Sequence, residues 1–309
     1  MERRQFLGAF PLLLAACQTP PKAPPAQAPP LLPPGAPTPS AVAPLPPAAP
    51  KRPPKLGLAL GGGAARGFAH IGVIQVLEEA GIRPDLVVGT SAGSLVAALY
   101  AHGHNGAELA NLALTMDEGA ITDWAYPSRG LIRGDALARY VREHTGHLPI
   151  ERLKLRLGIV ATDLDSGTAV LFERGDTGQA VRASSSVPAV FQPVKIGSRE
   201  YVDGGLVSPV PVRFARQMGA EMVIAVDIST PPEGNATDDT MKLLLQTFAI
   251  MGKSINRFEL QDADIVLRPA LVGVGSADFT SRVRAIRAGR EVASRLLPEI
   301  MAKQVALAR

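Results

Sequence analysis

The sequence predicts an α/β fold in which a mostly parallel central sheet is covered by helices on both faces. Short, continuous apolar segments, typical of strands that are buried on both faces, alternate with segments of helical periodicity. A Gly-containing turn follows each of the first two expected strands. The composition is that of a globular chain, since 46% of the 309 residues are hydrophobic and only 19% are charged.

The expected elements follow one another in a regular order. The first strand, 56–60, stops at a run of glycines, and helical periodicity then continues as far as Gly81. After Pro84, the second strand, 86–88, runs into another turn and a helix through 95–101. Further strands are expected at 157–161, 169–172, 222–227 and 265–267, and further helices at 134–143, 211–217, 240–260 and 281–303.

Residues 1–17 have the pattern of an export signal. Arg3 and Arg4 precede an apolar run that is too short to span a bilayer and that ends at Cys17. The last four residues, 14–17, resemble a bacterial lipobox, which implies lipidation of Cys17 and a lipid-anchored protein of the cell envelope. Because Gln18 follows the cysteine, we expect the outer membrane, facing the periplasm, if the organism is Gram-negative. The paired arginines fit either twin-arginine or Sec-type export.

Residues 18–54 predict an extended tether. Sixteen of these 37 residues are Pro and none is acidic, so the segment cannot form a packed core. At about 3.1 Å per residue in polyproline II, it reaches on the order of 100 Å. A Pro-rich ligand for a partner domain is the alternative. We expect the catalytic domain at 55–309, with its core motifs in 56–228 and a helical part in 229–309.

The charge balance excludes a strongly basic nucleic-acid binder. Residues 1–54 hold five of the 32 basic and one of the 28 acidic residues, which leaves 27 of each in the folded part. The last expected helix is locally basic, which fits a solvated face or a contact with anionic lipid headgroups. The single cysteine excludes an intramolecular disulfide and a Cys-rich zinc site.

The turn after the second strand has the sequence G-x-S-x-G, from Gly89 to Gly93. Between a strand and a helix this pattern is typical of a nucleophile elbow, in which small neighbours allow a strained turn that exposes the serine, here Ser91. The helix that follows places the positive end of its dipole near a developing oxyanion. Ser91 is therefore the candidate nucleophile.

The turn after the first strand reads G-G-G-A-A-R-G, from Gly61 to Gly67. Free backbone N–H groups in such a turn can hold an anion. A phosphate-binding P-loop would need a lysine that is absent here, and a dinucleotide site would need an acidic residue where Gly89 and Thr90 stand. The remaining candidate is the oxyanion of an acyl-transfer intermediate.

A serine nucleophile needs a base, and the histidines limit the choice. The last of the five is His147, so 162 residues at the end of the chain contain none, whereas an α/β-hydrolase places its histidine late. His144 and His147 leave too little chain after Ser91 for the usual acid. Asp203, in the sequence Asp203-Gly204-Gly205, is the carboxylate that we expect to act as the base.

Together these motifs resemble the patatin-like phospholipase family, over about 56–228. The order of Gly-rich turn, G-x-S-x-G and Asp-Gly-Gly matches, and 183–188 looks like the loop that the family has ahead of its Asp-Gly motif. The resemblance implies a patatin-like fold and a Ser–Asp dyad of Ser91 and Asp203. It also implies an oxyanion hole at Gly62, Gly63 and the nearby Arg66. One departure is Ala64, which stands where the family pattern has its second Gly.

We therefore expect a serine lipid acyl hydrolase that acts on membrane lipid or another fatty acyl ester and reaches the membrane through Cys17. The alternatives are an esterase or thioesterase for soluble acyl esters, and a non-catalytic envelope scaffold. The reaction requires no cofactor and no metal, and a calcium site built from scattered Asp is a minor alternative. Nucleic acid is not expected as a partner, and the sequence does not identify protein partners.

Overall fold

The structure is a computed structural model that describes residues 52–117, 119, 121–124, 129–275 and 278–309. The predicted lipidation site, Cys17, and the predicted tether up to residue 51 lie outside the described residues. None of the described helices combines the length and the hydropathy needed to cross a bilayer.

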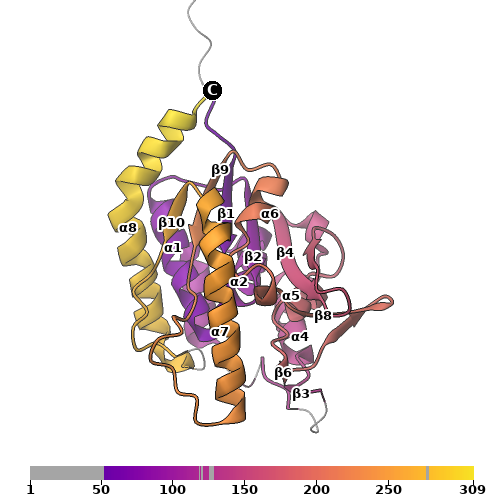
Figure 1. The fold of residues 1–309 in the computed structure, drawn as a ribbon. Helices are drawn as coiled ribbons and strands as arrows, with labels where there is room; N and C mark the ends of the chain where they lie inside the picture. Colours follow the sequence, from indigo (N-terminus) through magenta and orange to yellow (C-terminus); the bar gives the residue numbers. More distant parts are fainter. Residues whose placement is uncertain (1–51, 118, 120, 125–128, 276–277) are drawn as a thin grey trace, which may run out of the picture. The chain divides into compact units, whose positions relative to one another are not determined.

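The sheet at the centre of the described part is mostly parallel, as the sequence predicts (Figure 1). Its strands are β1 (Leu56–Leu60), β2 (Leu86–Thr90), β4 (Arg156–Asp163), β5 (Ala169–Phe172), β7 (Val194–Ile196), β8 (Arg199–Asp203), β9 (Met222–Val226) and β10 (Ile265–Leu267). Their order is β10-β9-β1-β2-β4-β8-β7, and β5 also pairs with β4. The first five strands in this order are parallel, whereas β5, β7 and β8 pair antiparallel. A separate two-stranded sheet joins β3 (Gly130–Ile132) to β6 (Ala189–Phe191).

Helices cover both faces of the sheet because successive strand residues point to opposite sides. The helices are α1 (Phe68–Glu79), α2 (Ala92–His102), α3 (Gly106–Thr115), α4 (Asp135–His144), α5 (Thr177–Ser184), α6 (Val212–Gln217), α7 (Thr240–Glu259) and α8 (Arg282–Leu307). Leu58 and Leu60 pack into the core formed with α1, α2 and α8. Ala59 packs into the opposite core, which α6 closes. The expected two-sided α/β architecture is confirmed.

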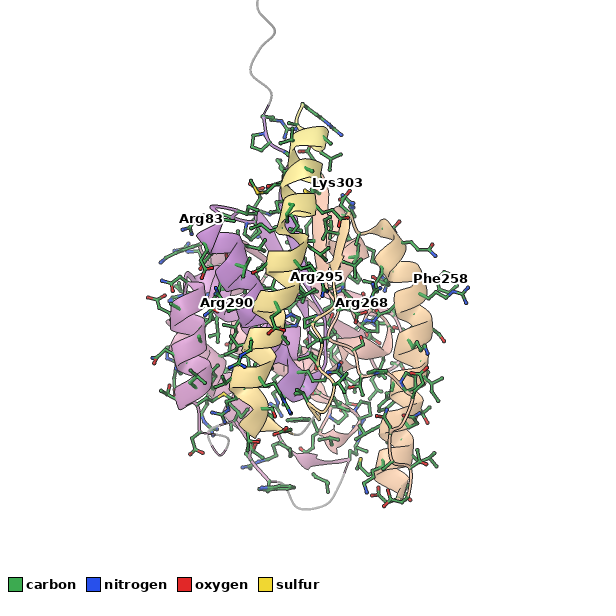
Figure 2. The ribbon with its side chains drawn as sticks, turned by 90° about the vertical axis from the view of Figure 1, so that its left-hand side faces the viewer. Arg83, Phe258, Arg268, Arg290, Arg295 and Lys303 are labelled. Carbon is green, nitrogen blue, oxygen red and sulfur yellow. The ribbon has the colours of Figure 1, made fainter. Side chains whose placement is uncertain are left out.

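Some of the basic side chains of α8 form ion pairs with neighbouring elements. Figure 2 looks onto this helix, from which Arg290, Arg295 and Lys303 project. Arg290 pairs with Glu79 of α1 at 2.8 Å, and Lys303 lies 3.3 Å from Asp264. Whether the basic face of α8 is solvated or contacts anionic lipid stays a prediction.

Candidate active site

Ser91 stands at the turn between β2 and α2, at the carboxyl end of the sheet. Its backbone has φ 53° and ψ −124°, a conformation that is strained for any residue with a side chain. The turn leaves no space for other side chains, since a Cβ on Gly93 would lie 2.1 Å from the carbonyl oxygen of Leu60. A Cβ on Gly89 would lie 2.4 Å from the carbonyl oxygen of Gly93. The glycines of the motif therefore allow the strained turn that presents Ser91.

The Gly-rich turn lies directly beside Ser91 because β1 and β2 are adjacent and parallel. A Cβ on Gly62 would lie 3.1 Å from the Cβ of Ser91. The amides of Gly61 and Gly62 donate to the carbonyl oxygens of Val226 and Pro209, at 3.0 and 2.9 Å. They are therefore already used, and Gly62 does not offer its N–H group to a ligand in this arrangement.

The amides of Gly63, Ala64 and Ala65 donate to no group among the described residues. Arg66 donates its own amide to the carbonyl oxygen of Gly63 at 3.1 Å, and its side chain is buried. Burial lowers the pKa of the Arg66 guanidinium, and the charge of Asp227 partly offsets this. Of the three positions predicted for the oxyanion hole, only Gly63 has an amide without an acceptor among the described residues.

Asp203 ends β8 and reaches the same edge of the sheet as Ser91, with β4 between their strands. Its side chain is buried, and Oδ1 accepts a 2.6 Å hydrogen bond from the amide of Gly205. The other oxygen, Oδ2, is buried and has no partner at normal hydrogen-bond geometry among the described groups. A Cβ on Gly204 would lie 2.2 Å from the carbonyl oxygen of Val160, so the glycine lets Asp203 approach β4 closely.

Burial raises the pKa of the Asp203 carboxyl to about 6. The nearby Ser91 hydroxyl and the hydrogen bond from the Gly205 amide act in the opposite direction and limit this rise. Because Oδ1 is occupied by Gly205, Oδ2 is the oxygen left for the hydroxyl. The structure thus brings together the two residues that the sequence singled out, although they are more than 100 positions apart.

The histidines do not join this arrangement as bases. In the described part of the chain, no hydrogen bond or ion pair links a histidine to Ser91 or Asp203. His70 is fully buried on α1 and its Nε2 donates to the carbonyl oxygen of Gly61 at 2.8 Å. Burial lowers the pKa of His70 to about 4, so the ring is neutral and supports the Gly-rich turn. No described cluster of His, Cys, Asp and Glu has the geometry to hold a metal ion.

An apolar cavity of about 70 Å³ begins at the site and extends between α1, α2 and α3. At one end it is lined by Ala64 and Gly67 of the Gly-rich turn and by Ala92, which follows Ser91 directly. Leu109 and Leu112 line it from α3. Sequence reasoning missed this cavity because α3 was not among the expected helices. It singled out 183–188 only as a family-like loop and gave no contact to Ser184 and Ser186, buried polar residues that contact the backbone of Ser91 and Asp203.

Known proteins resemble this chain in sequence and in fold. An uncharacterized NTE family protein of Mycobacterium tuberculosis is 37% identical over 188 residues, which are 60% of this chain and 52% of that protein. Patatin-like phospholipase domain-containing protein 6 of Mus musculus is 35% identical over 187 residues, covering 58% of this chain and 14% of the mouse protein. The crystal structure of VipD from Legionella pneumophila matches the fold with a TM-score of 0.56 and 16% identity. That match covers 81% of this chain and 68% of VipD.

This chain spans about half the length of the mycobacterial relatives and a small part of the mouse protein. The model of the family described as patatin-like phospholipase matches residues 58–216, which hold the Gly-rich turn, the elbow and the Asp-Gly-Gly motif. The chain belongs to the patatin-like phospholipase family.

Proposed function

We propose that the protein hydrolyses fatty acyl esters of phospholipids or lysophospholipids, with Ser91 as the nucleophile and Asp203 as its base. The observation that carries this proposal is the buried Asp203 carboxyl, which has one oxygen free and a pKa raised to about 6, with the Ser91 hydroxyl near enough to limit that rise. A carboxylate of ordinary pKa would be a weak base for a hydroxyl, and the raised value improves the match.

The proposed reaction proceeds in two halves. Asp203 accepts the proton of Ser91 as Oγ attacks the acyl carbonyl, and the oxyanion is held by the amides of Gly63 and Ala64 and by the N-terminal end of α2. Asp203 then donates this proton to the leaving alcohol, which leaves an acyl-enzyme. Water attacks the acyl-enzyme, Asp203 again accepts a proton, and it returns that proton to Ser91 as the fatty acid departs.

The apolar cavity supports a long acyl chain as the substrate group. It begins at Ala92 and the Gly-rich turn, and Leu109 and Leu112 extend its apolar lining away from the nucleophile. Burial of each CH₂ group in such a cavity contributes about 0.8 kcal/mol to binding. One relative, of Debaryomyces hansenii, is named lysophospholipase NTE1, which agrees with this substrate class.

We further propose that the enzyme is a lipid-anchored protein of the cell envelope. The support is the lipobox-like sequence that ends at Cys17 and the Pro-rich residues that follow. In a Gram-negative organism the anchored position is the outer membrane, facing the periplasm. The folded part would then correspond to 55–309, with 18–54 as its tether.

The test compares wild type with Ser91→Ala and Asp203→Asn on phosphatidylcholine vesicles, lysophosphatidylcholine micelles and p-nitrophenyl butyrate. We expect wild type to release long-chain fatty acids from the lipids, detected by mass spectrometry, and both variants to lose this activity to a similar extent. Hydrolysis of the butyrate alone would favour a soluble-ester hydrolase. Wild type no faster than Ser91→Ala on all three substrates would favour the non-catalytic scaffold.

A further inference from the structure

The end of α5 and the residues after it contact the backbone of both proposed catalytic residues. Ser184, the last residue of α5, accepts the amide hydrogen of Ser91 on its Oγ at 2.8 Å. Two residues later, the carbonyl oxygen of Ser186 accepts the amide hydrogen of Asp203 at 2.9 Å. Both serines are fully buried. One short segment therefore holds the nucleophile with a side chain and the base with its backbone.

The orientation of the Ser184 hydroxyl follows from its two partners. Its Oγ also lies 2.6 Å from the carbonyl oxygen of Val160 on β4. A carbonyl oxygen can only accept and an amide can only donate, so the Ser184 proton points to Val160 and a lone pair points to Ser91. Thr90 and Val160 are the last paired residues of β2 and β4. The hydroxyl thus extends the connection between these strands by one residue, at the point where the elbow leaves the sheet.

The elbow needs this connection because its geometry leaves the Ser91 amide without a partner inside α2. The first N–H groups of a helix have no acceptor within the helix. Ser91 is only 9% exposed, so an unsatisfied amide would be costly, and its backbone is already strained. Ser184 satisfies the amide and opposes relaxation of the strained turn. On the other side, the Thr162 hydroxyl donates to the carbonyl oxygen of Asp203 at 2.8 Å, which fixes the base to β4.

We propose that Ser184 is a positioning residue for the hydrolysis, and that with the carbonyl of Ser186 it sets the separation between the Ser91 hydroxyl and the Asp203 carboxyl. This inference rests on the roles proposed above for Ser91 and Asp203. Ser184 exchanges no proton in the reaction, since its own proton is bound to a carbonyl. Its effect is on the fraction of time that Ser91 and Asp203 are in hydrogen-bonding geometry.

The test is Ser184→Ala, which removes the acceptor while it leaves the backbone of the segment unchanged. We expect kcat to fall by about 10- to 100-fold, as for a misplaced reacting group, with KM within about twofold of wild type. The rate of labelling of Ser91 by a fluorophosphonate should fall in parallel. The matched control is Thr145→Val, which removes another fully buried hydroxyl that donates to a backbone carbonyl, that of Val141 at 2.8 Å. It should lower the melting temperature without changing kcat per folded molecule.

A second variant, Ser184→Cys, keeps nearly the same shape with a weaker acceptor. Its kcat should fall between those of wild type and Ser184→Ala, and it replaces Ser184→Ala if the latter does not fold. Wild-type kcat and labelling rate in folded Ser184→Ala or Ser184→Cys would overturn the positioning role. Wild type no faster than Ser91→Ala on any ester would overturn the proposed function itself, a result that is distinct from the first.

Discussion

At the scale of single residues, two positions at the site adopt a backbone conformation that side chains disfavour. Ser91 has φ 53° and Ala64 has φ 50°. The sequence already indicated that Ala64 occupies a position where the family pattern has Gly, and the structure shows that it takes the positive φ despite its Cβ, at a cost of about 1 kcal/mol. Both strained residues border the space where the proposed oxyanion would form. The fold stabilises this local strain with the buried contacts of its surroundings.

The raised pKa of Asp203 predicts the acid side of the pH profile. The carboxyl must be ionised to accept a proton, and burial raises its pKa to about 6, so kcat/KM should fall below about pH 6, tenfold for each further unit. The fall cannot come from His70, whose pKa burial lowers to about 4. A pH series of hydrolysis rates on a neutral ester measures this. Replacement of His104 and His144 by Gln should leave the profile in place, and a fall centred near pH 4 would contradict the prediction.

The same burial predicts that Asp203→Asn stabilises the protein at neutral pH. Between about pH 4 and 6 the unfolded chain releases the Asp203 proton while the folded protein retains it, so the free energy of unfolding decreases as the pH rises through this window. Asn cannot ionise and avoids this loss, which is about 3 kcal/mol above pH 6. Urea unfolding should show a much larger gain at pH 8 than at pH 4.5.

The control for this prediction is Asp163→Asn, for which the expected change in the free energy of unfolding has the opposite sign. The backbone amide of Ser166, followed by the Arg199 side chain, lowers the pKa of Asp163 to about 2. Its ionised form is therefore favoured in the folded state, so Asp163→Asn should lose stability above about pH 4, and the loss should disappear as the pH falls through about 2. If both variants were destabilised at pH 8, burial of the Asp203 charge would not be a cost to the fold.

At the scale of elements, α3 forms one wall of the apolar cavity beside the proposed site. It begins at Gly106 after Asn105, whose side chain accepts the amides of Ala107 and Glu108 at 3.0 Å each. Its buried face closes the apolar cavity that begins at Ser91's neighbour Ala92. The length of this cavity along α3, rather than the catalytic residues themselves, would therefore limit the acyl chain.

We predict that Leu112→Trp shortens the accepted acyl chain. Leu112 lines the cavity and is only partly buried, so α3 can accommodate the larger ring at a small cost in stability. Hydrolysis of p-nitrophenyl palmitate should fall at least tenfold relative to the butyrate, mainly through KM. The matched control is Leu114→Trp on the same helix, since Leu114 is 50% exposed and does not line the cavity. Equal loss on both esters would argue against an acyl-binding cavity.

The elements that the sequence predicted and those that it did not differ in a physical respect. The strands β1 and β2 and the helices after them were predictable because continuous apolar runs meet Gly-containing turns at their ends. Helix α5 is short and contains Gly178, and β8 is one strand of a hairpin of short strands. Neither segment is long enough to show a clear periodicity of hydrophobic residues. The start of helix α3 is marked in the sequence by the capping box of Asn105 and Glu108. A prediction based on composition and periodicity alone does not detect such a box.

The candidate site likewise contains features that the sequence could predict and features that it could not. Ser91 could be proposed from its local motif, and Asp203 from the missing late histidine together with the family resemblance; the structure places both at the same end of the sheet. The free amides of Gly63 and Ala64 could not be predicted, because Pro209 and Val226, which occupy the neighbouring amides, come from distant parts of the chain. The contact of Ser184 with Ser91 joins residues 93 positions apart and is visible only once β4 and α5 are packed.

At the scale of the whole described part, α8 connects the end of the chain to the start of the sheet. It crosses α1 at two glycines: a Cβ on Gly72 would lie 1.9 Å from the carbonyl oxygen of Ile286, and one on Gly289 would lie 2.0 Å from that of Ala69. Beyond the crossing, the backbones of Arg52 and Arg309 exchange hydrogen bonds of 2.7 and 3.1 Å. The chain therefore enters the fold at the amino end of β1, and the candidate site lies at the carboxyl end of the same strand.

This placement gives the predicted anchor a testable role. The described chain begins at Arg52, at the end of the sheet opposite Ser91, so the proposed anchor at Cys17 should affect where the enzyme is and not how fast it reacts. We predict that Cys17→Ser leaves an uncleaved precursor and abolishes labelling by a clickable fatty acid in cells. Its kcat on detergent-dispersed lysophosphatidylcholine should stay within about twofold of wild type, since a change far from the reacting atoms removes no transition-state contact.

Ser91→Ala is the complementary control, because it should be labelled and retained in the membrane fraction like wild type while it hydrolyses nothing. Together the two variants separate location from chemistry. Normal lipid labelling of Cys17→Ser would show that Cys17 is not the lipidated residue. Loss of turnover on dispersed substrate in folded Cys17→Ser would show that the N-terminal segment contributes to the site itself, contrary to its entry at the opposite end of β1.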